Sequence, residues 1–209
     1  MPVREPGFRL VRLPLVLHTP GMDDAYLDRV LVGGREQREI VIADYDEAWP
    51  VRFSAERSRI AAALGDRALR IEHIGSTSVP GLAAKPIVDI LVEVARLEDA
   101  DLARAGYVLR VREDGHRMFR TPELDVHVHV WPSGSPDIAS DLAFRDRLRA
   151  SAEDRAAYEA LKRELATRDW EDMNHYADAK GALIREIRAR GGYQDTTSDA
   201  RPRGSHSAK

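Results

Sequence analysis

The sequence predicts an α+β fold, in which helices pack on a mixed β-sheet and a C-terminal helical segment follows the sheet. Most strand patterns lie before residue 131, whereas residues 137–190 have helical patterns. Strands first and helices last are typical of this fold class. The clearest strand is 123–130, where polar and apolar residues alternate strictly.

A chain of 209 residues is long enough to bury one sizeable core, which we expect within residues 38–192. Residues 1–37 are expected to form a partly disordered N-terminal extension. Residues 193–209 contain almost no apolar side chains and should be a disordered tail. The apolar stretch near the N-terminus is too short and too interrupted to span a membrane, so no membrane partner is expected.

Charge and cysteine content narrow the functional classes. The net charge is −3, and charges of both signs are mixed along the chain. Nucleic-acid binders usually show a basic excess or stripe, so no nucleic-acid partner is indicated. The chain has no cysteine, which excludes disulfides and thiolate chemistry and suits a reducing cytoplasm, where we expect the protein.

Capping and periodicity predict the other elements. Asp46 stands as the N-cap of a helix that Gly65 ends, and an apolar stripe of that helix should face the core. The pair Asp114-Gly115 predicts a hairpin turn. The remaining strands are expected at 39–43, 70–74, 87–94, 107–112 and 117–121, and the helices at 23–31, 47–64, 97–105, 137–151, 153–168 and 171–190.

A small-residue turn between two strands is the first candidate site. The strand 70–74 stops at Gly75, Ser76, Thr77 and Ser78, a turn short enough to bring backbone N–H groups against a phosphate. In the next strand, 87–94, alternation places Asp89 and Glu93 on one face. They are roughly 13 Å apart at strand rise, too far to share one metal ion. Asp89 therefore needs a partner from another strand.

The strand 123–130 supplies a second set of polar side chains. One face carries, in order, Glu123, Asp125, His127 and His129. If this strand lies beside 87–94, Asp89 and Asp125 converge on one Mg²⁺, an ion that prefers carboxylate oxygens. The histidine pair with Asp125 would instead suit a transition metal. The third interpretation is a solvated polar face on an antiparallel sheet.

Two cations interrupt the apolar stripes of the C-terminal helices. Arg145 lies in the stripe of 137–151, and Lys180 lies in the stripe of 171–190. A cation in such a stripe must reach solvent or meet an anion, so both are candidate phosphate contacts, with Lys85 as a third. Tyr176, one turn before Lys180, would orient that lysine or stack on a base. The alternative for these cations is internal ion pairing, with Asp141 and Asp146 near Arg145.

The block from His73 to Asp89, read HIGSTSVPGLAAKPIVD, resembles the signature of the GrpB family, which belongs to the nucleotidyltransferase superfamily. Shorter pieces extend the resemblance to about residues 38–190: Tyr45-Asp46 with Trp49, 144–149, Tyr158 with Leu161-Lys162, and Tyr176 with Lys180. The resemblance implies a nucleotidyltransferase-like mixed sheet. It also implies that Gly75-Ser76 form the phosphate turn and that Asp89 is the first metal-binding acid. Leu91 stands where that superfamily has its second acid.

These observations give three functional hypotheses. The first is nucleotidyl transfer from a nucleoside triphosphate to an unknown acceptor. In it, Asp89 and Asp125 hold Mg²⁺, Gly75 to Ser78 contact the phosphates, and His127 is the general base. The second is a non-catalytic nucleotide- or coenzyme-A-related module, because domains of this kind occur fused to dephospho-coenzyme A kinase. The third is a scaffold with a vestigial pocket that binds no ligand.

Overall fold

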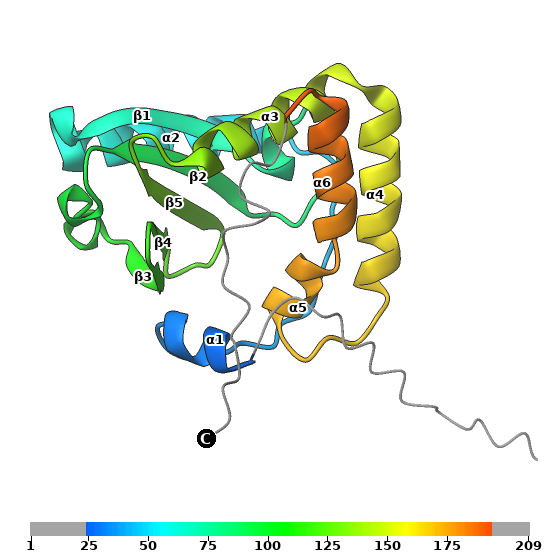
Figure 1. The fold of residues 1–209 in the computed structure, drawn as a ribbon, viewed down its shortest axis with the longest axis horizontal. Helices are drawn as coiled ribbons and strands as arrows, with labels where there is room; N and C mark the ends of the chain where they lie inside the picture. Colours follow the sequence, from blue (N-terminus) through cyan, green and yellow to red (C-terminus); the bar gives the residue numbers. More distant parts are fainter. Residues whose placement is uncertain (1–23, 194–209) are drawn as a thin grey trace, which may run out of the picture.

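A computed structural model describes residues 24–193 of the chain (Figure 1). The predicted disorder of residues 1–23 and 194–209 lies outside the described residues. The strands are β1 (Ala68–Ile74), β2 (Val88–Val94), β3 (Val108–Glu113), β4 (His116–Arg120) and β5 (Val126–Pro132). The helices are α1 (Asp24–Val30), α2 (Ala48–Leu64), α3 (Pro136–Ala150), α4 (Ala152–Ala166), α5 (Met173–Asp178) and α6 (Gly181–Arg190). The predicted α+β class is confirmed.

The five strands form one mixed sheet in the order β1-β2-β5-β4-β3. Only β2 and β5 run parallel, and they lie side by side as the first metal hypothesis requires. In their register Asp89 is directly opposite His127, and Leu91 is opposite His129. The predicted hairpin at Asp114-Gly115 joins β3 to β4. The sheet therefore brings two polar strand faces, predicted separately, onto one surface.

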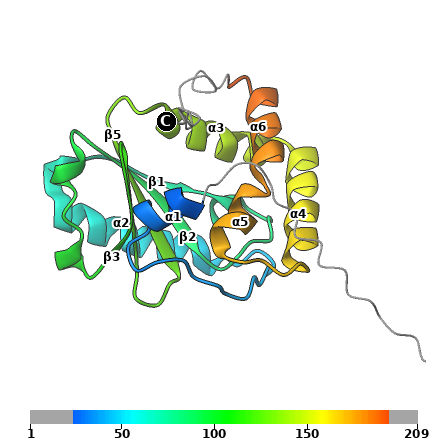
Figure 2. The same cartoon turned by 60° about the horizontal axis from the view of Figure 1, so that its bottom comes forward.

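Helices cover both faces of the sheet (Figure 2). On one face, α2 packs its apolar stripe against the even-numbered residues of β2 and β5, among them Val92 and Val128. On the other face, Ile138 of α3 packs against Ile74 and Leu91. The carboxylate of Asp46 accepts a hydrogen bond from the Ala48 N–H (2.8 Å), and Gly65 ends α2 with a positive φ of 55°. The predicted end of this helix at Gly65 is confirmed. The predicted N-cap is one residue off, because Glu47 occupies that position without a side-chain capping bond and α2 begins at Ala48.

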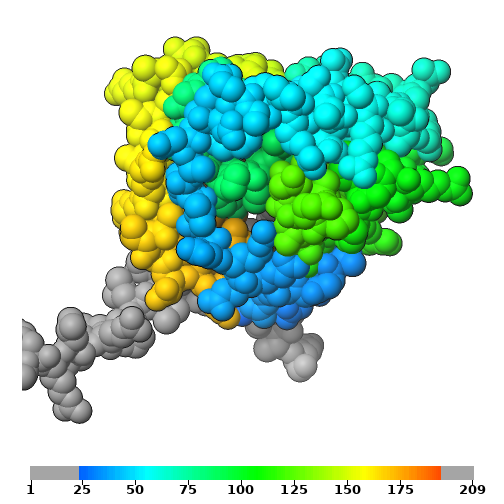
Figure 3. Space-filling model, turned by 180° about the vertical axis from the view of Figure 1, so that it is seen from behind, coloured from blue at the N-terminus to red at the C-terminus, as the bar shows by residue number. Residues whose placement is uncertain are grey.

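The C-terminal helices form a second layer at one end of the sheet (Figure 1). Phe144 and Leu148 of α3 pack with Tyr158 of α4 and Ile187 of α6. At the β3 edge of the sheet, α1 lies on β3 through its own apolar cluster. The segment between α1 and α2 (blue) crosses the back of the molecule alongside α4 (yellow) (Figure 3), where Asp44 pairs with Arg163 at 2.7 Å.

Three predicted elements differ from the structure. In the expected strand 39–43, only Ala43 forms a bridge, with Ala84, because the segment crosses the surface without a neighbouring strand and Val41 stays 53% exposed. The expected helix 97–105 is two separate 3₁₀ turns. Ala100 and Leu102 are both buried there, and a spacing of two residues does not place both on one face of a helix.

The third difference is the expected helix 171–190, which breaks into α5 and α6. At the break the Lys180 N–H bonds to the carbonyl of Ala177, three residues back, and glycine follows at position 181. Glycine disfavours helix continuation. The break points Tyr176 and Lys180 toward the sheet. No helix among residues 24–193 is long and apolar enough to cross a membrane.

Candidate functional site

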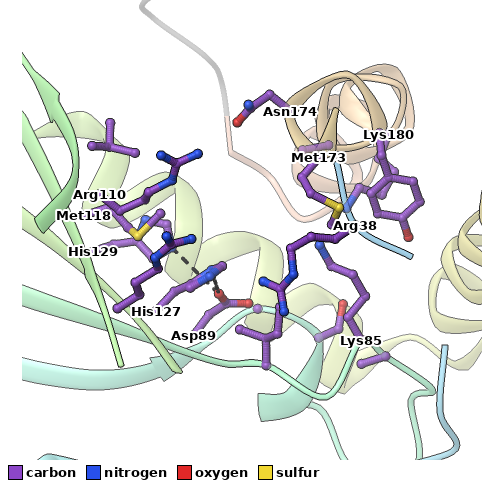
Figure 4. Close-up of a pocket in the computed structure, with 18 of the residues that line it drawn as sticks. Arg38, Lys85, Asp89, Arg110, Met118, His127, His129, Met173, Asn174 and Lys180 are labelled. Carbon is purple, nitrogen blue, oxygen red and sulfur yellow. Dashed lines mark ion pairs between the residues drawn. The ribbon is translucent and has the colours of Figure 1, made fainter. Parts of the chain in front are cut away.

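A cavity of about 310 Å³ lies between the sheet and the α5–α6 break (Figure 4). Its floor is Asp89, flanked on one side by His127 and His129 from β5. The opposite wall carries Lys85 and Lys180. The other polar lining residues are Glu36, Arg38, Ser76, Arg110, Arg120, Tyr158, Lys162, Asn174 and Tyr176. The cavity is thus a cationic pocket around a single strand carboxylate.

Gly75 fixes the position of that carboxylate. It follows β1 with φ +68° and ψ −171°, a combination that is essentially restricted to glycine. A Cβ built on Gly75 would lie 2.4 Å from Oδ2 of Asp89, closer than any non-bonded contact allows. The backbone of the turn and the Asp89 carboxylate are therefore in direct contact.

Asp89 also faces two imidazoles. Its Oδ1 lies 3.5 Å from Nδ1 of His127 and 3.8 Å from Nε2 of His129. Burial opposes the charged carboxylate, but the two histidines outweigh it and hold the pKa of Asp89 well below its ordinary range. Burial likewise disfavours the His129 imidazolium, yet the ion pair with Asp89 raises the pKa of His129. The cluster is a coupled group of one acid and two bases.

A second row of side chains supports His129 from behind. Its Nδ1 lies 3.3 Å from Nε2 of His116, whose Nδ1 lies 2.9 Å from a carboxylate oxygen of Glu113. The His116 ring stacks on Trp131 at a centroid distance of 4.0 Å. Burial lowers the pKa of His116. These contacts fix the ring plane of His129.

The lysine wall is built around Tyr176. The ammonium groups of Lys85 and Lys180 lie 5.2 and 4.4 Å from the centre of its ring. Neither ammonium has a carboxylate within 4.0 Å in the part of the chain that the structure describes. Burial, together with repulsion from Lys85 and Lys162, lowers the pKa of Lys180 to about 7. Burial also lowers the pKa of Lys85. Asp89 attracts both ammonium groups from a distance, but it does not outweigh burial, so the charged form of each lysine is only partly compensated.

Tyr176 is fully buried, and its hydroxyl has no hydrogen-bond partner within residues 24–193. Burial raises its pKa to about 12, so the hydroxyl stays protonated. A buried hydroxyl without a partner is costly, so an ordered water or a bound ligand is needed to satisfy it.

Several predicted site residues lie elsewhere or have other partners. Asp125 does not meet Asp89: its carboxylate accepts from Thr121 Oγ1 (2.7 Å) and pairs with Arg52 of α2 (3.2 Å). The reason is local, because Leu124 has a positive φ of 63° and strand alternation starts only at Val126. The expected convergence of the two acids is therefore wrong.

Three predicted phosphate contacts, Arg145, Thr77 and Ser78, have partners within the protein instead. Arg145 does not line the cavity and instead pairs with Glu72 and Asp146. Internal ion pairing is the alternative interpretation given above for this cation. The Thr77 hydroxyl lies between Ile87 O and the ring of His73, and the Ser78 hydroxyl bonds Gly75 O at 2.7 Å. These two hydroxyls shape the turn and do not reach the cavity. Of the other predicted residues, Gly75, Ser76, Lys85, Tyr176 and Lys180 do line it, as do Asp89 and His127.

Four cations that line the cavity were not predicted from the sequence as site residues: Arg38, Arg110, Arg120 and Lys162. Lys162 is the most deeply buried of them. It is 2% exposed, donates to the carbonyl of Ala83 and lies over the ring of Tyr158. Burial lowers its pKa to about 8. Tyr158, Lys162 and Leu165 share one buried face of α4. The signal that identified Lys180, a cation inside an apolar stripe, was therefore present here too.

The fold and the cavity define an α+β protein whose mixed sheet carries a cationic pocket beside an aspartate and two histidines. A family model described as "GrpB protein" matches residues 39–190. A UPF0157 protein of Streptomyces coelicolor is 52% identical over 167 residues, covering 78% of this chain and 89% of that protein. The chain belongs to the GrpB family.

A solved structure agrees with this assignment. The crystal structure of conserved protein GrpB from Enterococcus faecalis is similar with a TM-score of 0.65 and 34% identity, covering 72% of this chain and 96% of that one. A dephospho-CoA kinase of Mycolicibacterium paratuberculosis is 31% identical over 175 residues, covering 68% of this chain but 43% of the kinase.

Proposed function

We propose that the cavity binds a phosphate-bearing small molecule, a nucleotide or a related coenzyme. The observation that carries the proposal is the lysine wall: Lys85 and Lys180 face the cavity without a carboxylate partner in the described residues, beside the unpartnered hydroxyl of Tyr176. A polyphosphate would supply the missing negative charge, and its oxygens would accept from the ammonium groups and from the tyrosine. The cavity volume suits a small-molecule ligand.

Ligand-dependent thermal unfolding tests the proposal. Nucleoside triphosphates, coenzyme A, dephospho-coenzyme A and inorganic phosphate are each added to the purified chain in the presence of a chelator. A ligand at about a hundred times its dissociation constant should add roughly 2.7 kcal/mol to the unfolding free energy. Lys85→Met and Lys180→Met should reduce that gain. Arg104→Met is the matched control, because it removes one positive charge from a side chain that is 93% exposed.

Two results would contradict the proposal. One is the absence of stabilisation by every phosphate-bearing compound. The other is an equal gain in wild type, Lys85→Met and Lys180→Met.

Nucleotidyl transfer is the first form that such binding can take. It is favoured by the contact between Gly75 and Asp89, which corresponds to the phosphate turn and first acid of the superfamily that the chain resembles. Magnesium remains a proposal for this reaction, with Asp89 as its carboxylate ligand, since the other lining carboxylate, Glu36, is paired with Arg120. Release of pyrophosphate from nucleoside triphosphates, measured in wild type and Asp89→Ala, tests this form.

A binding module without transfer is the second form. It is favoured by Leu91, which occupies the position of the second acid, is fully buried and packs under α3. The similarity to one part of a dephospho-CoA kinase fits an accessory role beside a separate catalytic domain. In this case Asp89→Ala changes ligand affinity, and no pyrophosphate is released by either protein.

A further inference from the structure

We propose that Asp89, His127 and His129 form a binding site for a first-row divalent transition ion such as Zn²⁺, Mn²⁺ or Fe²⁺. The inference deepens the proposed function, because the ion would lie at the floor of the same cavity. Each of the three residues offers one ligand atom, and these atoms all lie within 4.8 Å of one another. Among the described residues, no other trio of this kind meets that criterion.

The distances leave room for an ion with little movement. Four ligands about 2.0–2.1 Å from a tetrahedral ion are roughly 3.3 Å from one another. Asp89 Oδ1 is already 3.5 Å from His127 Nδ1 and 3.8 Å from His129 Nε2. The ligands come from two hydrogen-bonded strands in fixed register, so a contraction of a few tenths of an ångström brings Asp89 to coordination distance from each histidine. The third separation, between the two imidazole nitrogens, lies within 4.8 Å, and rotation of the rings would close it.

The supporting contacts orient each ligand. Oδ2 of Asp89 rests against Gly75, which leaves Oδ1 toward the histidines. Behind His129, a consistent set of donors runs toward Glu113. In one tautomer of the pair, His116 donates from Nδ1 to that carboxylate and accepts at Nε2 from Nδ1–H of His129. An ion bound in this tautomer would replace the Nε2 proton that pairs with Asp89 in the free protein, and the Nε2 lone pair would then face the ion. A carboxylate–histidine chain behind a ligating imidazole is the common support of metal sites.

The donor set decides between ions. Magnesium prefers six oxygen ligands and is usually held by carboxylates and substrate phosphates. Here Asp125 is bound to Arg52 and Thr121, and Leu91 replaces the other acid, so two imidazole nitrogens take the places that oxygen donors would need. Two histidines with one carboxylate are typical of transition-ion sites with open coordination positions. Those positions would face the lysine wall, where a phosphate oxygen could complete the sphere.

Metal titration of the untagged full-length chain tests the assignment. The protein is stripped with a chelator, desalted and titrated with Co²⁺, whose visible absorption reports nitrogen ligation, and Zn²⁺ and Mg²⁺ are added as competitors. We expect one high-affinity equivalent, displacement by Zn²⁺, and a Mg²⁺ affinity weaker by at least about 100-fold. His127→Gln and His129→Gln should each weaken Co²⁺ binding by about 100-fold or more, and Glu113→Gln by about 10–100-fold. Asp125→Asn is the matched control and should bind as wild type does.

Each contrary outcome overturns the site. Equal affinity for Mg²⁺ and Zn²⁺, unchanged Co²⁺ binding in both histidine variants, or loss of binding in Asp125→Asn would do so. Imidazole ¹⁵N resonances of the wild type need no variant to fold: one equivalent of Zn²⁺ should shift those of two histidines, and the absence of any shift refutes the site. These titrations contain no phosphate ligand, whereas the ligand test for the proposed function contains a chelator. Failure of one is therefore distinguishable from failure of the other.

Discussion

Replacing Gly75 by alanine should destabilise the protein in two ways, through backbone strain and through a collision with Asp89. Ordinary van der Waals contact begins at 3.4 Å, and the new Cβ would lie 2.4 Å from Oδ2, so the carboxylate must retreat by about 1 Å. A non-glycine residue at this φ and ψ costs about 1–3 kcal/mol of strain. Displacing a charged, hydrogen-bonded carboxylate costs about a further 1.5–3 kcal/mol.

Gly65→Ala is the matched control for the strain alone. Gly65 has a similar backbone, with φ 55° and ψ −136°, and a Cβ there meets nothing within 4 Å. Urea unfolding, followed by tryptophan fluorescence at unchanged m-value, gives both losses. We expect Gly75→Ala to lose about 1.5–3 kcal/mol more than Gly65→Ala. Equal losses would refute the claim that Gly75 is required by its contact with Asp89.

Three further predictions concern individual side chains. Because folding lowers the pKa of Lys180 from 10.5 to about 7, the unfolded chain binds more protons between these values. The stability of wild type relative to Lys180→Met should therefore rise with pH from 7 to 10.5 and level off below 7, and a flat difference in urea unfolding would exclude the shift. Arg145→Met should lower stability by about 0.5–1.5 kcal/mol, because it removes the hydrogen bond to the His73 carbonyl and the ion pair with Glu72, which is 40% exposed, while the affinity for phosphate-bearing ligands stays unchanged in calorimetry. Leu148→Ala should lower the free energy of unfolding by about 2–5 kcal/mol in urea, because Leu148 of α3 is fully buried against α4 and α6. The control Leu69→Ala, at a residue that is 54% exposed, should lower it far less.

The sheet was largely predictable because its strands have strong local patterns. The alternation in β5 follows from one buried face, whereas β2 is apolar almost throughout because helices cover both of its faces, with Val92 in the α2 cluster and Leu91 in the α3 cluster. Short elements were predicted less well. The residues around Val41 have a pattern typical of a strand. A segment forms a strand only where another strand pairs with it, and the sequence does not reveal that this segment lacks such a neighbour.

The sequence predicted which residues belong to the candidate site better than it predicted which side chains contact one another there. Asp89, Lys85 and Lys180 line the cavity as the sequence indicated. Asp125 was misplaced because its direction depends on one left-handed residue, Leu124, just before the strand. The supporting contact from His116 to His129 joins two strands, and no spacing along the chain reveals it.

The buried lysines lower the stability of the free protein but favour the binding of an anion. Burying Lys85, Lys162 and Lys180 near one another costs folding free energy, which is why burial lowers the pKa of all three. A protein with no use for these charges would be more stable with apolar side chains of similar length there. An anion in the cavity changes the balance, since it favours the charged ammonium groups and is itself held more strongly where water is excluded. Burial of these lysines thus destabilises the free protein, and ligand binding offsets that loss of stability. For the same reason, Lys180→Met should raise the stability of the free chain near neutral pH while reducing the stabilisation that a phosphate-bearing ligand provides.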